Sequence, residues 1–189
     1  MDKVINTTRK GFRIFKERVK KQGMGITLVW IYGRGIPAIT GVPILRYCKI
    51  TPEVYVGSQF RLKGKHLLER EGINAVVNMR KEFDDAAHDL TLEHYCHLPT
   101  IDDDAPSMQA LTRGVTFMQD VITGGGKIYV HCAGGVGRAP TMAAAYYISQ
   151  GMSVSDALAL ITNVRPFIYI TPIQMERLSE WSQKWQKQA

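Results

Sequence analysis

Cysteine is scarce in this chain and is not organised. The 189 residues include three cysteines, Cys48, Cys96 and Cys132. Their odd number and wide separation exclude a disulfide framework, and no pair has the spacing of metal ligands. We therefore expect an intracellular, reducing compartment, and the sequence predicts no metal or other cofactor.

The chain also lacks an unbroken apolar run. Residues 26–45 are largely apolar, but they are interrupted by Gly33, Arg34, Gly35, Pro37, Gly41 and Pro43. This interruption argues against a membrane-spanning helix. The segment also lacks the small-residue cleavage site of a signal peptide. Internal repeats and low-complexity tracts are missing as well, which excludes a repeat architecture.

Acidic residues are rare in the first quarter of the chain. Residues 1–49 hold 11 Lys and Arg against Asp2 and Glu17, a net charge of +9, whereas residues 50–189 hold 13 against 15. The positive charge therefore belongs to an N-terminal arm, residues 1–49, and not to the domain that follows, residues 50–189. Such an arm is typical of contact with an acidic surface, anionic lipid or nucleic acid, and of these we expect contact with an anionic membrane and no nucleic acid partner.

The arm is predicted to begin with a helix. Apolar residues recur at helical spacing between Val4 and Val19, with basic residues around them, which predicts a basic amphipathic helix over 3–21 that ends at Gly23 and Gly25. An irregular apolar segment follows. Two interpretations stay open: the arm lies in a membrane interface, or the helix packs on the domain with its charged face in water.

From Ile50 onward the pattern predicts a single α/β domain. Strands are expected at 53–57, 75–79, 94–98 and 128–130, and helices at 60–71, 107–123, 140–150, 154–164 and from 172 through 185. Ser153 is the expected cap of the helix at 154–164. This alternation predicts a mainly parallel central sheet flanked by helices, with the active site at the carboxyl ends of the strands.

One predicted strand runs into a glycine-rich loop, residues 131–140, His-Cys-Ala-Gly-Gly-Val-Gly-Arg-Ala-Pro. Pro140 is typical of a first helical turn, so the loop lies at a helix N-terminus, where free N–H groups attract an anion such as phosphate. The same field favours the thiolate of Cys132, which is the form that attacks phosphorus, and Arg138 can hold two phosphate oxygens. The substrate contacts predicted within the loop are Ala133, Gly134, Gly135, Val136 and Gly137. The alternative is an ordinary buried cysteine beside a tight turn.

The spacing His131-Cys132-x5-Arg138 resembles the signature of the cysteine-dependent phosphatases, and the chain resembles their compact dual-specificity branch. The resemblance implies a phosphocysteine intermediate, with Cys132 as nucleophile, Arg138 on the phosphate and His131 orienting the cysteine through the loop. Leu98-Pro-Thr-Ile-Asp102 resembles the loop that carries the general acid, and it selects Asp102 over Asp103 and Asp104. Ile170-Thr-Pro-Ile-Gln174 resembles a pocket loop that supplies a glutamine near the hydrolytic water, which makes Gln174 a further candidate.

One position departs from the family. A serine or threonine usually follows the signature arginine and stabilises the departing thiolate in the second step, whereas this chain has Ala139. The change is expected to slow phosphocysteine breakdown.

From about residue 30 to the end, the chain is similar to the mitochondrial phosphatidylglycerophosphate phosphatase subgroup and its prokaryotic relatives. The similar segments include Tyr-Gly-Arg-Gly-Ile-Pro37, Ile50-Thr-Pro-Glu-Val-Tyr-Val-Gly57 and Val76-Val-Asn-Met79. The resemblance implies a phospholipid head group as substrate, and a location in the cytoplasm, peripherally on a membrane, or in mitochondria if the source is eukaryotic. Against it, that subgroup carries basic loop residues where this chain has Ala133 and Val136.

Three alternatives remain. A phosphoprotein phosphatase for phosphotyrosine and phosphoserine or phosphothreonine is the second interpretation, and a glucan phosphatase, whose loop resembles Cys-x-x-Gly-x-Gly-Arg-Ala-Pro, is the third. The non-enzymatic alternative is a scaffold that binds phosphate without turning it over.

Overall fold

A four-stranded sheet forms the centre of the domain. The structure is a computed structural model that describes the backbone of residues 2–186 and the side chains of residues 19–20 and 23–185. Its strands are β1 (Val54–Ser58), β2 (Ala75–Arg80), β3 (His94–Thr100) and β4 (Ile128–Cys132), all parallel and in the order β1-β4-β2-β3. The carboxyl ends of parallel strands share one edge, so this order brings Ser58, Asn78 and Cys132 together there.

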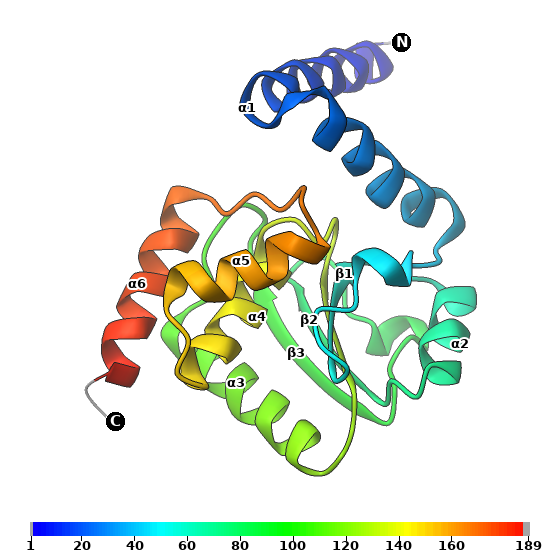
Figure 1. Cartoon of the computed structure of the whole chain (residues 1–189). Coiled ribbons are helices and arrows are strands. Elements are labelled where there is room, and N and C mark those ends of the chain that lie inside the picture. The colour runs from blue at the N-terminus through cyan, green and yellow to red at the C-terminus, as the bar shows by residue number, and fades with distance from the viewer. Residues whose placement is uncertain (1, 187–189) are drawn as a thin grey trace.

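Helices cover both faces of the sheet (Figure 1). One face carries Val56, Val77 and Val130 and packs in the main core against α3 (Met108–Thr123), α4 (Arg138–Ser149), α5 (Val154–Val164) and α6 (Pro172–Gln186). The other face carries Tyr55 and Tyr129 and packs around Leu68 of α2 (Leu62–Arg70). Adjacent residues of a strand point to opposite faces, which explains the two cores. The predicted α/β fold with a mainly parallel sheet is confirmed.

The predicted elements of the domain each lie within two residues of an observed one. Local signals explain this agreement: the Ser107 hydroxyl caps α3 by accepting from Ala110 N at 3.1 Å, and the Ser153 hydroxyl caps α5 by accepting from Asp156 N at 3.1 Å. Two short 3₁₀ turns, η1 (Leu45–Tyr47) and η2 (Ala86–His88), were not predicted.

The prediction of an irregular segment after Gly25 is wrong. Helix α1 extends over Asp2–Thr40 as two helical parts joined at a kink, where Gly23 has φ 81° and ψ 165°. Gly23 thus ends the first part as predicted, but Gly25 lies inside the second part. Glycine and proline only weaken a helix, and here the second part ends properly at Gly41, whose φ is +71° and whose N–H donates to Pro37 O at 2.8 Å.

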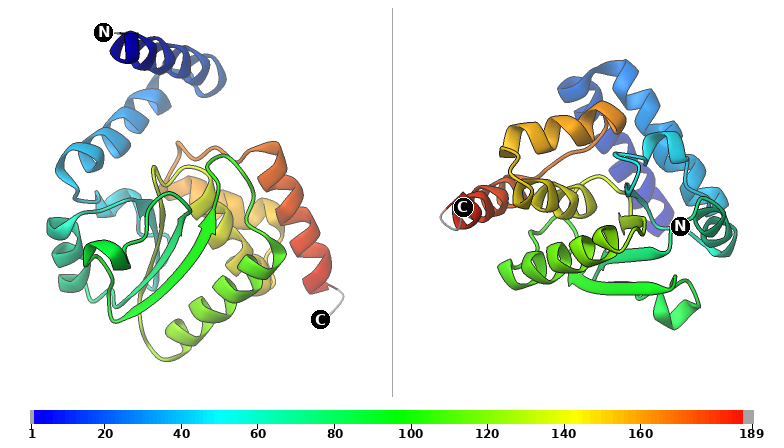
Figure 2. Two further views of the ribbon diagram at one scale, coloured as in Figure 1. Left: turned by 180° about the vertical axis from the view of Figure 1, so that it is seen from behind. Right: turned by 60° about the horizontal axis from the view of Figure 1, so that its bottom comes forward.

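The second part of α1 packs on the domain. Its Tyr32 ring lies edge-on to Tyr47 at 6.3 Å, and Gly33 lies directly against the Phe167 ring, which leaves no room for a side chain there. Figures 1 and 2 show this part descending onto the side of the domain where the strands end. The basic side chains predicted to surround the first helix lie mostly before residue 19, outside the described side chains, so its amphipathic character stays a prediction, as does the division of the chain at residue 49. No helix of the described residues is long and apolar enough to cross a membrane.

Candidate active site

The cysteine loop lies between β4 and α4. Cys132 ends the strand with 3% of its surface exposed, and its Sγ accepts a hydrogen bond from Gly135 N at 3.2 Å. Residues 133–137 then lead into α4, which begins at Arg138 with Pro140 in its first turn. The loop therefore curls around the sulfur at the positive end of a helix, which is the environment that an anion and a thiolate both favour.

A buried arginine, Arg165, holds the loop in this shape. It follows α5, is 1% exposed, and donates to Gly135 O at 2.5 Å, to Gly134 O at 3.1 Å and to Tyr47 O at 2.8 Å. In a planar trans peptide the carbonyl and the next N–H point in opposite directions, so drawing Gly134 O outward turns the Gly135 N–H inward, toward Cys132. Gly135 has φ +62°, and a Cβ there would collide with Gly57 O, so the position requires glycine.

A second arginine, Arg138, faces a ring of acceptors. Its Nη1 and Nη2 donate to the two carboxylate oxygens of Glu82 at 2.9 and 3.0 Å, and Nη1 also donates to Thr100 O at 2.8 Å. The Nε is buried and has no hydrogen-bond partner among the described residues, which leaves it available to a phosphate oxygen. The hydrogen bonds from Arg138 lower the pKa of Glu82 to about 2, so this carboxylate stays ionised well below the ordinary pKa of a glutamate.

Of the three neighbouring aspartates, only Asp102 forms an ion pair with Arg138. Its Oδ1 lies 2.8 Å from Nη2, and its side chain is 72% exposed at the mouth of the loop. The other two join the loop of residues 101–104 to residues 171–174: Asp103 O accepts from the Thr171 hydroxyl at 3.2 Å, and Asp104 O accepts from Gln174 at 2.9 Å. The geometry thus favours Asp102 over its neighbours, although its role as acid stays a prediction.

His131 lies beneath the loop, fully buried. Its Nε2 lies 2.6 Å from the Asp85 carboxylate, which is also fully buried, and its Nδ1 has no hydrogen-bond partner within the described part of the chain. Asp85 in turn accepts from the Gln59 amide at 2.8 Å. The expected hydrogen bonding through the loop is not among these contacts. The position of His131 is instead held from the segment after β2.

Comparison with known proteins identifies the family. Residues 54–184 match the family described as "Dual specificity phosphatase, catalytic domain". The chain belongs to this family. The human "Phosphatidylglycerophosphatase and protein-tyrosine phosphatase 1" is 29% identical over 145 residues, which cover 71% of this chain and 72% of that protein. Mouse dual specificity protein phosphatase 8 is 28% identical over 130 residues, covering 67% of this chain and 19% of that protein.

Solved structures agree with this assignment. The crystal structure of PTPMT1 in complex with PI(5)P superposes with a TM-score of 0.67 at 27% identity, covering 74% of this chain and 96% of that one. That of human DUSP28, at 21% identity, shows the same fold, with a TM-score of 0.66 over 75% of this chain and 99% of that one. The protein is a dual-specificity-type phosphatase, and the predicted family and enzyme class are confirmed.

Gln174 is a further residue that the sequence predicted in the phosphatase site. It is fully buried, and its Oε1 accepts from Thr171 N at 3.1 Å while its Nε2 donates to Asp104 O. A Cβ on Gly137 would lie 3.1 Å from Oε1, so the amide contacts the loop. Gln174 thus joins the loop of residues 101–104 to the end of the cysteine loop. Its contact with a hydrolytic water stays a prediction.

Three residues of the site were missed, Glu82, Asp85 and Arg165. Glu82 and Asp85 lie two and five residues after the end of β2, at the edge where the carboxyl ends of parallel strands meet, and this position was a usable signal. Arg165 stands beside the apolar run Pro166–Ile168 after α5, where a charged residue is unexpected unless it is paired. Its partners are 30 to 118 positions away, so the sequence does not reveal them.

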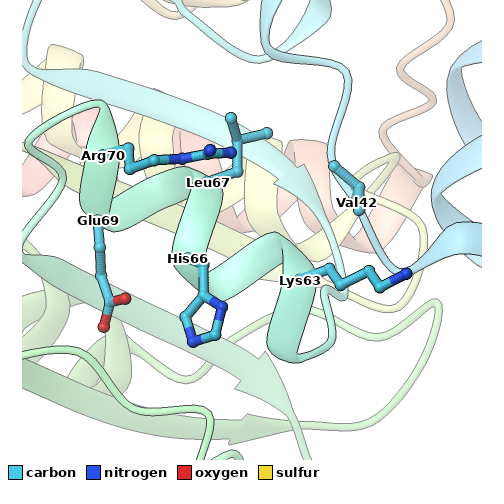
Figure 3. Close-up of a pocket in the computed structure, with 6 residues that line it drawn as sticks. All are labelled: Val42, Lys63, His66, Leu67, Glu69 and Arg70. Carbon is cyan, nitrogen blue, oxygen red and sulfur yellow. The ribbon is translucent and has the colours of Figure 1, made fainter.

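A wide hollow on the surface lies apart from this site. It has a volume of about 710 Å³ and is lined by Val42, Lys63, His66, Leu67, Glu69 and Arg70, chiefly from α2 (Figure 3). None of these residues belongs to the cysteine loop or contacts it through a hydrogen bond. A smaller cavity, of about 180 Å³, adjoins the loop at Ala133. Among the described side chains, no group of three or more His, Cys, Asp or Glu is arranged to hold a metal ion.

Replacing Asp102 with asparagine tests the choice of acid. We expect kcat for an alkyl phosphate to fall about 10²- to 10³-fold, because its alkoxide needs a proton to leave. The fall should be smaller for p-nitrophenyl phosphate, since nitrophenolate leaves without one. Asp103→Asn and Asp104→Asn are the matched controls and should stay within about 3-fold of wild type on both substrates. A larger loss in either control than in Asp102→Asn would transfer the role to that residue.

Proposed function

We propose that the protein hydrolyses the phosphomonoester of a phospholipid head group, such as that of phosphatidylglycerophosphate, through a phosphocysteine intermediate. The reaction takes place at the surface of an anionic membrane in a reducing compartment. The observation that carries the chemistry is the loop itself: the Sγ of Cys132 accepts a hydrogen bond from Gly135 N, and the buried Nε of Arg138 has no hydrogen-bond partner among the described residues.

The first step transfers the phosphoryl group to the enzyme. The Cys132 thiolate forms the S–P bond as the P–O bond to the head group breaks, and the carboxyl group of Asp102 gives its proton to the departing alkoxide. Arg138 and the loop N–H groups hold the equatorial oxygens, on which charge must be stabilised in the transition state. The ion pair of Asp102 with Arg138 at 2.8 Å supports this role, because it places the carboxyl group beside the phosphate site.

The second step hydrolyses the intermediate. Water forms a new P–O bond as the S–P bond breaks, its proton passes to Asp102, and inorganic phosphate leaves the restored thiolate. Ala139 is fully buried and offers no hydroxyl to the departing sulfur. The hydrogen bond from Gly135 N supports the thiolate in its place, which makes the second step feasible but slow.

An apolar stripe on α1 supports the membrane location. Met24, Leu28, Ile31, Tyr32 and Ile39 recur at helical spacing and are 45 to 79% exposed. Two further apolar side chains are exposed: Ile101, which directly precedes Asp102, and Tyr169, which precedes the segment that leads to Gln174. Apolar surface therefore occurs both on the arm, which has a charge of +9, and next to the phosphate site. This combination suits a lipid interface better than a soluble phosphopeptide.

The relatives support a lipid substrate without deciding it. The name of the human relative combines phosphatidylglycerophosphatase with protein-tyrosine phosphatase, and the superposed PTPMT1 structure is a complex with PI(5)P. Mouse dual specificity protein phosphatase 8 is similarly distant. The test must therefore distinguish a phospholipid substrate from a phosphoprotein substrate.

The test compares phosphatidylglycerophosphate in anionic vesicles with a phosphotyrosine and a phosphothreonine peptide. We expect kcat/KM for the lipid to exceed that for either peptide at least about tenfold, since a preference of one decade corresponds to a single good contact. Equal or faster turnover of the peptides would reject the lipid proposal in favour of a phosphoprotein phosphatase.

Leu28→Gln on α1 tests the contribution of the apolar stripe in the same assay. We expect weaker binding to anionic vesicles and slower lipid turnover, with hydrolysis of p-nitrophenyl phosphate unchanged, because an exposed residue does not support the core. Met152→Gln removes another exposed apolar side chain, on the turn between α4 and α5, and serves as the matched control. Equal vesicle binding by the two variants would exclude α1 as the membrane contact.

A further inference from the structure

A small cavity beside the cysteine loop combines two arginines with no acidic residue. It has a volume of about 180 Å³ and is lined by Arg34, Pro37, Ala38, Gly41, Ser58, Gln59, Arg61 and Ala133. Ala133 directly follows Cys132, and Ser58 is paired with Cys132 in the register of β1 and β4. The cavity therefore opens next to the position of the reacting phosphate.

Arg34 reaches the loop from α1. A Cβ built on Gly134 would lie 3.2 Å from Arg34 Nε and 3.4 Å from Cζ, so the missing side chain leaves room for the guanidinium. The backbone does not demand glycine there, since the φ of Gly134 is not among the positive ones. Arg34 is exposed and forms no ion pair with any carboxylate that the structure describes; its guanidinium lies 5.7 Å from the Trp30 ring.

Arg61 closes the other side of the cavity. It precedes the first residue of α2, and its guanidinium lies at 3.4 Å from the carbonyl oxygens of Ala38 and Ile39, at the end of α1. These long contacts leave most of its hydrogen-bonding capacity unused, because a guanidinium has five N–H donors. The neighbouring Gln59 amide is already bound to Asp85 and Arg80. The cavity thus has two arginines and no carboxylate among its lining residues, which favours the binding of an anion.

The loop itself carries little charge besides Arg138. Ala133 and Val136 offer none, so α1 and the start of α2 bring to this side of the loop the positive charge that the loop sequence lacks. The planar fork of arginine suits a phosphate group, whose oxygens it binds in pairs. The volume of the cavity equals that of about six water molecules in liquid water. This is enough room for a phosphodiester group with its adjoining carbon atoms.

We propose that Arg34 and Arg61 form a second anion subsite, which binds the phosphodiester of a phospholipid head group while its phosphomonoester lies in the cysteine loop. This proposal rests on the proposed function and specifies its substrate class: a head group with two phosphates, joined by a short polyol. A substrate with one phosphate would fill the loop and leave the subsite empty.

The test uses soluble molecules, so that membrane binding plays no part. The deacylated head group of phosphatidylglycerophosphate, which has a phosphomonoester and a phosphodiester, is compared with glycerol 3-phosphate as a competitor of p-nitrophenyl phosphate hydrolysis. In wild type, the inhibition constant of the head group should be lower. In Arg34→Gln it should rise about 10- to 100-fold, the range expected for a lost charged hydrogen bond. The inhibition constant of glycerol 3-phosphate should stay within about 3-fold.

Two further variants make the result specific. Arg34→Lys keeps the charge but not the fork, and its inhibition constant for the head group should fall between those of wild type and Arg34→Gln. Arg70→Gln removes an exposed arginine near the far end of α2 and should change neither constant. Unchanged hydrolysis of p-nitrophenyl phosphate in Arg34→Gln shows that the loop is intact.

Any of three results would overturn the proposal of a second subsite. Wild type could bind both competitors equally tightly, or Arg34→Gln could raise the inhibition constants of both competitors by the same factor or of neither. Equal weakening would mean that Arg34 only supports the loop. Failure of the proposed function looks different. The vesicle-bound lipid could fail to be preferred to phosphopeptides while Arg34→Gln still weakens binding of the soluble head group. That result would support the anion subsite and reject the membrane phospholipid as substrate.

Discussion

Cys132→Ser is expected to abolish turnover and to leave phosphate binding intact. The sulfur lies at the centre of the loop, where it accepts from Gly135 N and is 3% exposed. Serine fits this space, but its hydroxyl does not ionise near neutral pH and is a far weaker nucleophile. We expect kcat to fall on the order of 10⁴-fold or more, as for other nucleophile replacements. Binding of inorganic phosphate or vanadate should change only a few-fold, because Arg138 and the N–H groups remain.

Cys96→Ser is the matched control for this experiment. Cys96 is a buried residue of β3, and burial raises the pKa of its thiol, so it stays protonated and unreactive. The control should keep kcat within about 3-fold, although the buried hydroxyl can lower the melting temperature. The assignment of the nucleophile is wrong if Cys132→Ser retains substantial turnover. A wild-type protein that binds phosphate without turning over any phosphomonoester would instead support a scaffold.

Arg138→Lys is expected to lower kcat/KM about 10²- to 10³-fold, the cost of losing one group that stabilises transition-state charge. Lysine carries a single ammonium, which cannot hold both oxygens of Glu82 and present a further N–H to the phosphate. Turnover of p-nitrophenyl phosphate provides the measurement. Arg70→Lys, which makes the same change on the exposed surface of α2, should leave kcat/KM unchanged.

The same variant should alter the pH dependence of stability. The pKa of Glu82 is about 2 in the folded protein, below its ordinary value of 4.5, because Arg138 donates to it. A depressed pKa contributes stability that is fully present above about pH 4.5 and is lost as the pH falls toward 2. The melting temperature of wild type should therefore exceed that of Arg138→Lys most at neutral pH, and the difference should shrink between pH 4.5 and 2. A difference independent of pH would show that Glu82 is not held by Arg138.

The sequence determined the local features of this protein. Capping serines and period-two and helical patterns set the elements of the domain, since each depends on neighbours within a turn or two. The signature from His131 to Arg138 also lies within one continuous stretch, so its loop, its helix start and its family could be predicted. The phosphatase class followed from residues that are adjacent in the chain.

The tertiary structure decided which distant residues complete the site. Arg138 meets Glu82 across 56 positions, His131 meets Asp85 across 46, and Arg165 reaches Tyr47 across 118. These pairs depend on the strand order β1-β4-β2-β3, which no local pattern specifies. The course of α1 is the clearest case. Its glycines and proline predicted an irregular segment, whereas packing of Gly33 on Phe167 keeps it helical and brings Arg34 to the loop, because burial against the domain outweighs a weak local propensity.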